Sequence, residues 1–322
     1  MLEKRQEHWK GLAVGYLILA AMGAMMFVVV ALLDLLGVNE AKQWNGWMAL
    51  ASLVITGVGA IFLLVELGNK PKFILVFSNP SSIMTIGAYA LTLFMIADFI
   101  YATFFFDFIP WSGLSGLKDF FAILGIVAAL LLVTYPGIEL GEARGRRFWN
   151  GSALVPLFLI SATATGVACV ILAFVILGQG AADVIKVLDF TLLGLVIILP
   201  LMVGSYLLGM KHSGQVGAER AVAIILHGYY ETAFYGGFLL IGTVLSLATY
   251  LGGFIPSMLA IKSVAVLIGG ACLRNIFLGA AVQTGVPGEE REWYEEKELK
   301  YLAKRLDRRW QEKEKWLNPP QT

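Results

Sequence analysis

The sequence predicts an all-α polytopic membrane protein with eight transmembrane helices, because its composition, charge distribution and long apolar runs all favour this fold class. Of the 322 residues, 58% are hydrophobic and 15% are charged, and the mean hydropathy is +0.76. Soluble globular domains have about 25% charged residues, so this composition excludes a soluble enzyme. Residues 289–315 hold nine of the 24 Lys and Arg and nine of the 23 Asp and Glu, which leaves the preceding chain strongly apolar.

Apolar runs long enough to cross a bilayer recur along that preceding chain. A helix needs about 20 apolar residues to span a hydrocarbon core about 30 Å thick. The runs do not alternate apolar and polar residues, as the strands of a membrane β-barrel would, and the first run is too long for a cleavable signal peptide. Spans are therefore predicted at residues 12–34, 45–67, 83–106, 119–139, 151–178, 187–209, 221–250 and 255–283.

Both termini are expected on one side of the membrane because the number of spans is even. The loops on the opposite side contain four basic residues, Lys42, Lys118, Lys186 and Lys262. The side of the termini has ten, namely Lys4, Arg5, Lys10, Lys70, Lys72, Arg144, Arg146, Arg147, Lys211 and Arg220. Since cytoplasmic loops carry the excess of Lys and Arg, the termini are predicted to be cytoplasmic.

Several cofactors and partners are disfavoured by what the sequence lacks. A net charge of only +1 argues against binding to nucleic acid. The spans contain one histidine, His227, whereas a bis-histidine haem needs two. Cys169 and Cys272 lie in separate apolar runs and form no cluster for an iron–sulfur centre. We therefore expect no haem, iron–sulfur cluster or other metal in this chain, and any metal centre would belong to a partner.

Polar side chains of the first four spans fall near the membrane surface on the side of the termini. They combine phenols, carboxylates, a hydroxyl and an amide, which suits the polar headgroup of a molecule with an apolar tail, such as a quinone. Alternatively, the tyrosines are interfacial anchors and the acids merely end their helices. The candidate quinone-binding residues are Tyr16, Glu66, Asn79, Ser82, Tyr135 and Glu139.

A second candidate site lies deeper in the membrane. A rise of 1.5 Å per residue places Glu231 and Arg274 at matching depths, about 7 Å from the midplane, and His227 one turn below Glu231. These residues are predicted either to form a structural ion pair between the last two spans or to relay protons. Asp98 lies beyond the midplane with no obvious partner, and an intramembrane acid of this kind is a candidate for proton transfer.

A charged segment, residues 289–317, follows the helix breaker Gly285-Val286-Pro287-Gly288. Leucine and tryptophan recur in it at helical spacing, so we predict a helix. This helix either lies solvated near the lipid headgroups or docks a soluble partner subunit.

Three segments carry motifs in a fixed order along the chain. ELGNKPKFILVFSNPSSIMTIGAYAL at 66–91 has an acidic-Leu-Gly start followed by Asn-Pro-x-Ser, and YPGIELGEARGRRFWNGSALVPLFLISATATG at 135–166 has Tyr-x-Gly followed by Phe-Trp-Asn. IGGACLRNIFLGAA at 268–281 has Gly-Gly-x-x-Leu-Arg. These motifs resemble those of the NrfD/PsrC family, the membrane subunits of polysulfide reductase and its relatives.

The resemblance implies two four-helix bundles, at residues 1–150 and 151–284, followed by an extramembrane tail at 285–322. It implies a site for menaquinone or a similar quinone in the first bundle. It further implies a ferredoxin-like iron–sulfur partner that connects this site to a molybdenum catalytic subunit, in the plasma membrane of a prokaryote.

Individual residues match the family pattern to different degrees. Tyr135 matches the tyrosine at the quinone, Glu66 matches the acidic position that ends the second span, and Arg274 matches the arginine of the final span. Tyr16 departs from the pattern, because polysulfide reductase has a histidine there. In the best-known relatives this face of the membrane subunit looks outward, whereas the charge count predicts that it is cytoplasmic here.

The predicted function is therefore that of a quinone-reactive membrane subunit of a respiratory oxidoreductase, which exchanges electrons with an iron–sulfur partner and couples this to proton transfer. Two alternatives remain. One is a secondary transporter with a site at Asp98, Glu231 and Arg274, although Pro200 has no counterpart in the first half, as broken inverted repeats would require. The other is a passive membrane anchor that binds no quinone.

Overall fold

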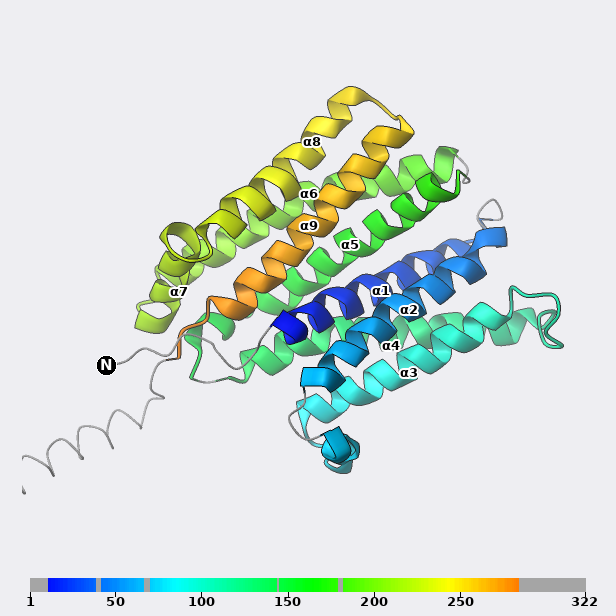
Figure 1. Cartoon of the computed structure of the whole chain (residues 1–322), viewed down its shortest axis with the longest axis horizontal. Coiled ribbons are helices and arrows are strands. Elements are labelled where there is room, and N and C mark those ends of the chain that lie inside the picture. Colours follow the sequence, from blue (N-terminus) through cyan, green and yellow to red (C-terminus); the bar gives the residue numbers. More distant parts are fainter. Residues whose placement is uncertain (1–10, 39–41, 67–69, 144, 179–181, 284–322) are drawn as a thin grey trace, which may run out of the picture.

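Long apolar helices make up the computed structural model, which describes residues 11–38, 42–66, 70–143, 145–178 and 182–283 (Figure 1). Eight helices in this part of the chain are long and apolar enough to cross a bilayer. The predicted fold class, an all-α polytopic membrane protein with eight spans, is confirmed. The predicted helix of the C-terminal tail lies outside the described residues.

The helices begin and end close to the predicted spans, except in the seventh. Gly178 ends α5 with a φ of 60°, a left-handed conformation that glycine adopts without strain. In chain order the elements are α1 (Gly11–Leu35), α2 (Lys42–Glu66), η2 (Lys70–Ser78), α3 (Ile83–Thr103), α4 (Ser115–Gly141), η3 (Arg147–Trp149), α5 (Leu154–Leu177), α6 (Ala182–Lys211), α7 (Val216–His227), η4 (Ala233–Leu245), α8 (Ser246–Ala248), η5 (Thr249–Gly252) and α9 (Pro256–Gly279).

The seventh span differs from the prediction because the helix breaks before the membrane. The short helix α7 ends at His227, and Gly228 follows with φ −131° and ψ −146°, which is outside the helical region. The chain then re-enters a helix of π type, η4, and the span runs from Ala233 to Gly252. The first part of the predicted span 221–250 is therefore wrong.

Helix α1 lies at the centre of the molecule, packed against α2, α4 and α5 (Figure 1). Small residues allow this close packing. A β-carbon on Gly23 would lie 2.3 Å from the Thr56 hydroxyl of α2, and one on Gly166 of α5 would lie 2.5 Å from Met25 of α1. One hydrophobic core extends from these helices to α9, and the division into two bundles at residue 150 stays a prediction.

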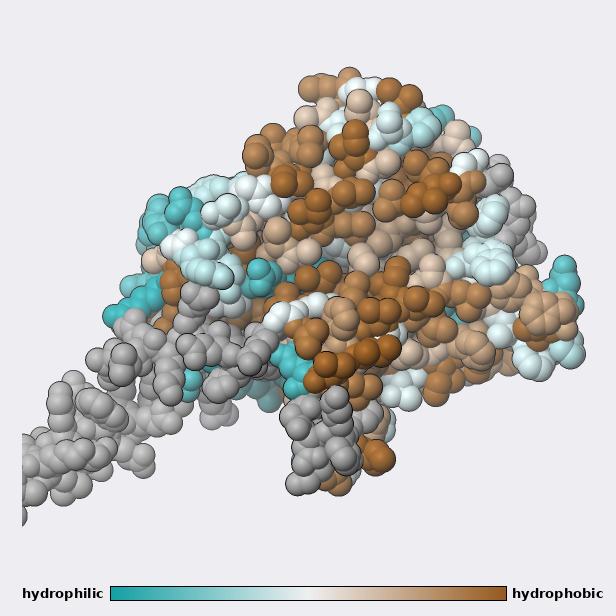
Figure 2. All heavy atoms as spheres, in the orientation of Figure 1, coloured by the Kyte–Doolittle hydropathy of each residue, from teal (hydrophilic) through white to brown (hydrophobic). Residues whose placement is uncertain are grey.

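The face of the molecule in Figure 2 is hydrophobic along the helices and more polar toward their ends. Large apolar side chains such as Val54, Ile61 and Phe190 are exposed on the outside of the helices, as expected for a surface that contacts lipid. Both halves contain an interior proline, because Pro136 lies inside α4 and Pro200 inside α6. Pro136 lies near the end of the fourth span and Pro200 lies inside the sixth, so Pro136 is not at a position that corresponds to Pro200.

Candidate functional site

Two phenols from separate helices meet at the end of the molecule where α1 begins. The hydroxyl groups of Tyr16 on α1 and Tyr135 on α4 are 2.7 Å apart and share a hydrogen bond in which either can be the donor. Both side chains are buried, with 3% and 8% of their surface exposed. The sequence predicted only a common depth for these tyrosines, and the structure brings them into direct contact.

Glycines on the neighbouring helices make room for this tyrosine pair. A β-carbon on Gly87 of α3 would lie 2.4 Å from the ring of Tyr135, so only glycine fits there. Gly59 of α2 packs against the backbone of α1, where its β-carbon would be 3.4 Å from the carbonyl oxygen of Tyr16. Gly87 belongs to the motif at 66–91, but sequence reasoning gave it no role in the site.

Two carboxylates lie at the same end of these helices. Glu139 follows Tyr135 by one helical turn, is half-buried, and interacts electrostatically with both phenols. Glu66 is the last residue of α2 and is also half-buried. It lies one turn beyond Phe62, whose ring contacts Gly15 next to Tyr16. The structure thus places both acids at the end of the bundle that holds the phenols.

Asn79 and Ser82 belong to the turn that precedes α3. The exposed Asn79 accepts a hydrogen bond of 2.7 Å from the Ser81 hydroxyl through its side-chain oxygen. Ser82 is the N-cap residue of α3, although its hydroxyl makes no capping hydrogen bond. The Thr85 hydroxyl fastens the turn by donating to the carbonyl of Val76 over 2.7 Å. The contacts of Asn79 indicate a role in the turn, not at the phenols.

A small cavity lies between Tyr16 and Arg274 of α9. Its walls come from α1, α4, α5 and α9, and include Tyr16, Pro136, Phe158 and Arg274. Its volume is about 10 Å³, close to the space that one water molecule needs. Sequence reasoning assigned Tyr16 and Arg274 to two separate sites, and the structure joins them because α1 packs against α5 and α9.

The predicted group of His227, Glu231 and Arg274 does not form. Neither terminal nitrogen of Arg274 has a hydrogen-bond partner in the described part of the chain, whereas His227 and Glu231 are exposed. The predicted pairing was wrong because the depth estimate assumed a continuous helix, and the break at Gly228 moves His227 and Glu231 out of the span.

Asp98 has a partner that the sequence did not indicate. It is completely buried in α3 and accepts a 2.5 Å hydrogen bond from the hydroxyl of Ser52 on α2. Its other carboxyl oxygen, Oδ1, is buried without a partner among the described residues. The proposed transporter site is therefore not assembled, because Asp98, Glu231 and Arg274 lie in three different surroundings.

Comparison with known proteins gives the family. A family model described as "Polysulphide reductase, NrfD" matches residues 3–287. This chain belongs to the NrfD family. The assignment confirms the resemblance of the three motifs and implies a membrane subunit of a molybdoenzyme complex. A search of curated proteins found no match.

This NrfD protein contains a partly buried ion pair at the opposite end of the first four spans. Lys118 of α4 lies 2.6 Å from a carboxyl oxygen of Asp34 on α1, and the hydroxyl of Tyr101 donates to the same oxygen over 3.1 Å. Tyr101 follows Asp98 by three residues on α3, so this group continues toward the Asp98–Ser52 pair. Sequence reasoning counted Lys118 as a loop charge and missed the group.

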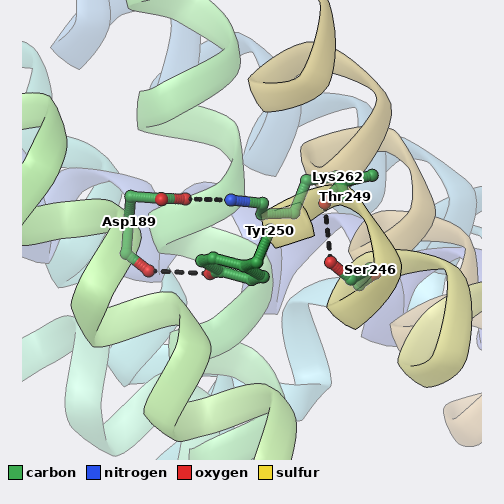
Figure 3. A network of polar contacts seen from close by, with 5 residues as sticks. All are labelled: Asp189, Ser246, Thr249, Tyr250 and Lys262. Atoms are coloured by element: carbon green, nitrogen blue, oxygen red, sulfur yellow. Dashed lines mark hydrogen bonds and ion pairs between the residues drawn. The ribbon is translucent and has the colours of Figure 1, made fainter. Parts of the chain in front are cut away.

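A second buried ion pair in the NrfD chain joins α6 to α9 (Figure 3). The ammonium of Lys262 lies 2.5 Å from a carboxyl oxygen of Asp189 and 3.3 Å from the ring centre of Tyr250. The Tyr250 hydroxyl donates to the backbone carbonyl of Asp189 over 2.8 Å. Lys262 is 2% exposed and was also counted as a loop charge. An acid and a lysine inside two apolar runs were the signal that could have revealed this pair.

Among the described residues, no group of three or more His, Cys, Asp or Glu side chains could hold a metal ion. The titratable residues of the first four spans are instead distributed along the length of these helices. The tyrosine pair and Glu139 lie at one end, Asp98 in the interior, and Asp34 with Lys118 at the other end. At the tyrosine end, these side chains can form hydrogen bonds to a bound molecule and exchange protons with it.

Proposed function

We propose that this chain is the quinone-reactive membrane subunit of a multi-subunit oxidoreductase. The hydrogen-bonded pair of Tyr16 and Tyr135 is the single observation that carries the proposal. Two phenols that meet inside an apolar bundle, next to the half-buried Glu139, provide the hydrogen-bond donors and the proton acceptor that a quinol headgroup requires. The apolar helices around them suit its hydrocarbon tail.

The quinone, menaquinone or a similar molecule, is the redox substrate, and the protein positions it and transfers protons. In the direction of quinol oxidation, the quinol gives two electrons to an iron–sulfur partner and two protons to residues of the site. Tyr16 and Tyr135 orient the oxygen of the headgroup, and Glu139 takes a proton as general base. The reverse direction uses the same residues with proton movement reversed.

The space around the phenols restricts how a quinone ring binds. The cavity between Tyr16 and Arg274 has a volume of about 10 Å³ and is too small for a ring. In this proposal the ring approaches from the side of Glu139 and Glu66, which are both half-buried. The headgroup oxygen then replaces the hydrogen bond between the phenols with bonds to itself.

The partners follow from the family assignment. The proposed partner is a ferredoxin-like iron–sulfur subunit that passes electrons to or from a molybdenum catalytic subunit, at a prokaryotic plasma membrane. It docks on the face that holds the tyrosine pair, since electrons have to leave there. Arg146 is already bound to the carbonyl of Ala281 and to the Trp149 ring, which leaves Arg147 as the neighbouring basic residue for docking.

The proposed orientation keeps the termini in the cytoplasm. Two of the four basic residues counted on the opposite side, Lys118 and Lys262, are held in ion pairs within the helices. When these two lysines are left out of the count of loop charges, the excess of basic residues on the side of the termini is larger. Labelling of a Thr322→Cys variant in oriented vesicles tests this, and labelling from the outside alone would reverse the assignment.

Proton transfer within the membrane is proposed for Asp98, which Ser52 holds by a hydrogen bond. Proton transfer by His227 and Glu231 is no longer supported, because both are exposed and outside the span. The transporter alternative also has no assembled site to support it. The passive anchor remains the competing function, and the following binding experiment separates it from the proposal.

The test measures quinone binding to the full chain in lipid nanodiscs. Organic extraction of the purified protein is expected to yield a co-purified quinone, and quinone-depleted protein should rebind a menaquinone analogue. Tyr135→Phe is expected to weaken this binding about tenfold, roughly 1.4 kcal/mol. Tyr206→Phe is the matched control, because it removes a buried hydroxyl whose hydrogen bond goes to the Phe148 carbonyl and not to either phenol of the pair.

Two results would contradict the proposal. One is the absence of both a co-purified quinone and analogue binding, which would favour a passive anchor. The other is equal binding by the wild type and the Tyr135→Phe variant, which would place any quinone away from the phenols.

A further inference from the structure

The guanidinium of Arg274 is a buried charge without a counter-charge among the described residues. It lies toward the C-terminal end of α9 with 3% of its surface exposed, and an arginine side chain in a protein stays protonated. Neither Nη1 nor Nη2 has a hydrogen-bond partner, and no ion pair joins Arg274 to a carboxylate within the part of the chain described here. Buried charges in proteins are paired with an opposite charge, so this one requires an anion from outside the described residues.

The cavity beside Arg274 is lined by one cation, one phenol and otherwise apolar residues. Its polar wall consists of the Arg274 guanidinium and the Tyr16 phenol, and the remaining wall is formed by apolar side chains of α1, α4 and α5. A guanidinium has donors and no acceptor. The lining residues include no carboxylate, so an anion is the favoured occupant beside this charge.

A further unpartnered donor lies near the same guanidinium. The hydroxyl of Ser161 on α5 is 1% exposed and has no hydrogen-bond partner among the described residues. A β-carbon on Gly270 would lie 3.9 Å from the Ser161 hydroxyl oxygen and 3.7 Å from Nη1 of Arg274. The absence of a side chain at Gly270 therefore leaves Ser161 and Arg274 in the same part of the α5–α9 contact.

The size of the cavity selects the kind of anion. A volume of about 10 Å³ is close to that of one water-sized sphere. A quinone ring, a phosphate or a carboxylic acid is larger than this, whereas a monatomic anion needs only a small movement of the lining side chains. The geometry and the charge together favour a halide.

We propose that this cavity is a binding site for one small monovalent anion of the halide class, with chloride as the natural occupant. Arg274 supplies the charge and the main hydrogen bonds, and the Tyr16 hydroxyl is the other polar group that lines the cavity. The bound anion neutralises the guanidinium at the contact of α1, α5 and α9, and it lies next to Tyr16. This anion therefore stabilises the packing of the first half of the chain against the second half.

The first test measures thermal unfolding of the full chain in lipid nanodiscs. Salts of chloride, bromide and gluconate are compared at equal ionic strength, so that general screening is constant. The melting temperature of the wild type is expected to rise with chloride or bromide and to saturate, as binding to the folded state requires, and to stay lower in gluconate. Equal melting temperatures in all three salts would overturn the proposal.

Variants assign this effect to the site. Arg274→Gln removes the charge and is expected to abolish the dependence on halide. Lys211→Gln removes an exposed charge at the end of α6 and should keep the full dependence. A halide effect that persists in Arg274→Gln would show that the anion binds elsewhere and would contradict the proposal.

A direct measurement covers the case in which Arg274→Gln does not fold. Crystals of the wild type grown in bromide are expected to give an anomalous peak within hydrogen-bonding distance of Arg274. Absence of this peak overturns the proposal, whether the density contains water only or a quinone oxygen. The outcome does not depend on quinone turnover, so it is separable from the test of the quinone site.

Discussion

The hydroxyl oxygens of Tyr16 and Tyr135 lie 2.7 Å apart, although 119 residues separate them in the chain. One of the two phenols donates its hydrogen to the other, which leaves one free hydrogen for a bound molecule. Replacing either tyrosine with phenylalanine removes the bond and half of the donor set while keeping both rings. The pair can therefore be tested without disturbing the packing of α1 against α4.

Gly87 is expected to control the position of the Tyr135 ring. A Gly87→Ala substitution puts a methyl group 2.4 Å from that ring, so α3 or the ring has to move. Overpacking of this kind costs about 1–3 kcal/mol. We predict a lower melting temperature and loss of quinone binding, measured on the protein in nanodiscs.

Gly194→Ala is the control for the loss of a helical glycine. A β-carbon on Gly194 of α6 would meet nothing within 4 Å, and alanine is the better helix former by about 1 kcal/mol. We expect the Gly194→Ala variant to have the melting temperature of the wild type or a higher one. If Gly87→Ala behaved like Gly194→Ala, the close contact between α3 and Tyr135 would be incorrect.

Ser52 is expected to stabilise the buried Asp98. Ser52→Ala removes the 2.5 Å hydrogen bond and leaves the carboxyl group without a partner, which costs about 1–3 kcal/mol. Chemical denaturation in detergent measures this loss. Ser263→Ala is the matched control, because the Ser263 hydroxyl is fully buried without a partner in the described part of the chain, and its removal should leave stability unchanged.

The Asp189–Lys262 ion pair is expected to be costly to break. Lys262→Met removes a charge that lies 2.5 Å from the Asp189 carboxylate and leaves that carboxylate without its cation, at a cost of about 3–5 kcal/mol. The double variant Asp189→Leu/Lys262→Met should recover part of this loss, because no uncompensated charge remains. Thermal unfolding of the single and double variants is the measurement.

Lys186→Met is the comparison for an exposed pair. Lys186 lies 3.1 Å from Asp183, but both side chains are largely in solvent, and exposed pairs contribute about 0–1 kcal/mol. A loss of stability in Lys262→Met no larger than in Lys186→Met would contradict the buried pair.

The eight spans were predictable from the sequence because hydropathy and length determine which segments enter a bilayer. The break at Gly228 was not predictable in the same way. Glycines occur throughout these apolar runs, and most of them lie in intact helices, so Gly228 gave no distinct signal. The depths of His227 and Glu231 were estimated along a straight helix, and this estimate failed where the helix ended.

The candidate site was predictable only as far as depth along each helix. Depth placed Tyr16 and Tyr135 at one level, but contact between them depends on how α1, α3 and α4 rotate and approach. The proximity of Tyr16 to Arg274 depends on the packing of α1 against α5 and α9, which are distant in sequence. The partners of Asp98 and Lys262 were missed for the same reason, since pairing across helices is a property of the folded bundle.

Quinol oxidation by the assembled complex tests the central claim most directly. The rate is measured with a menaquinol analogue for the wild type, Tyr135→Phe and the Tyr206→Phe control, each normalised to the amount of assembled complex. We predict that Tyr135→Phe lowers the rate at least about tenfold, roughly 1.4 kcal/mol of activation free energy, while Tyr206→Phe retains the wild-type rate. An unchanged rate in Tyr135→Phe, with the complex intact, would remove the tyrosine pair from the reaction.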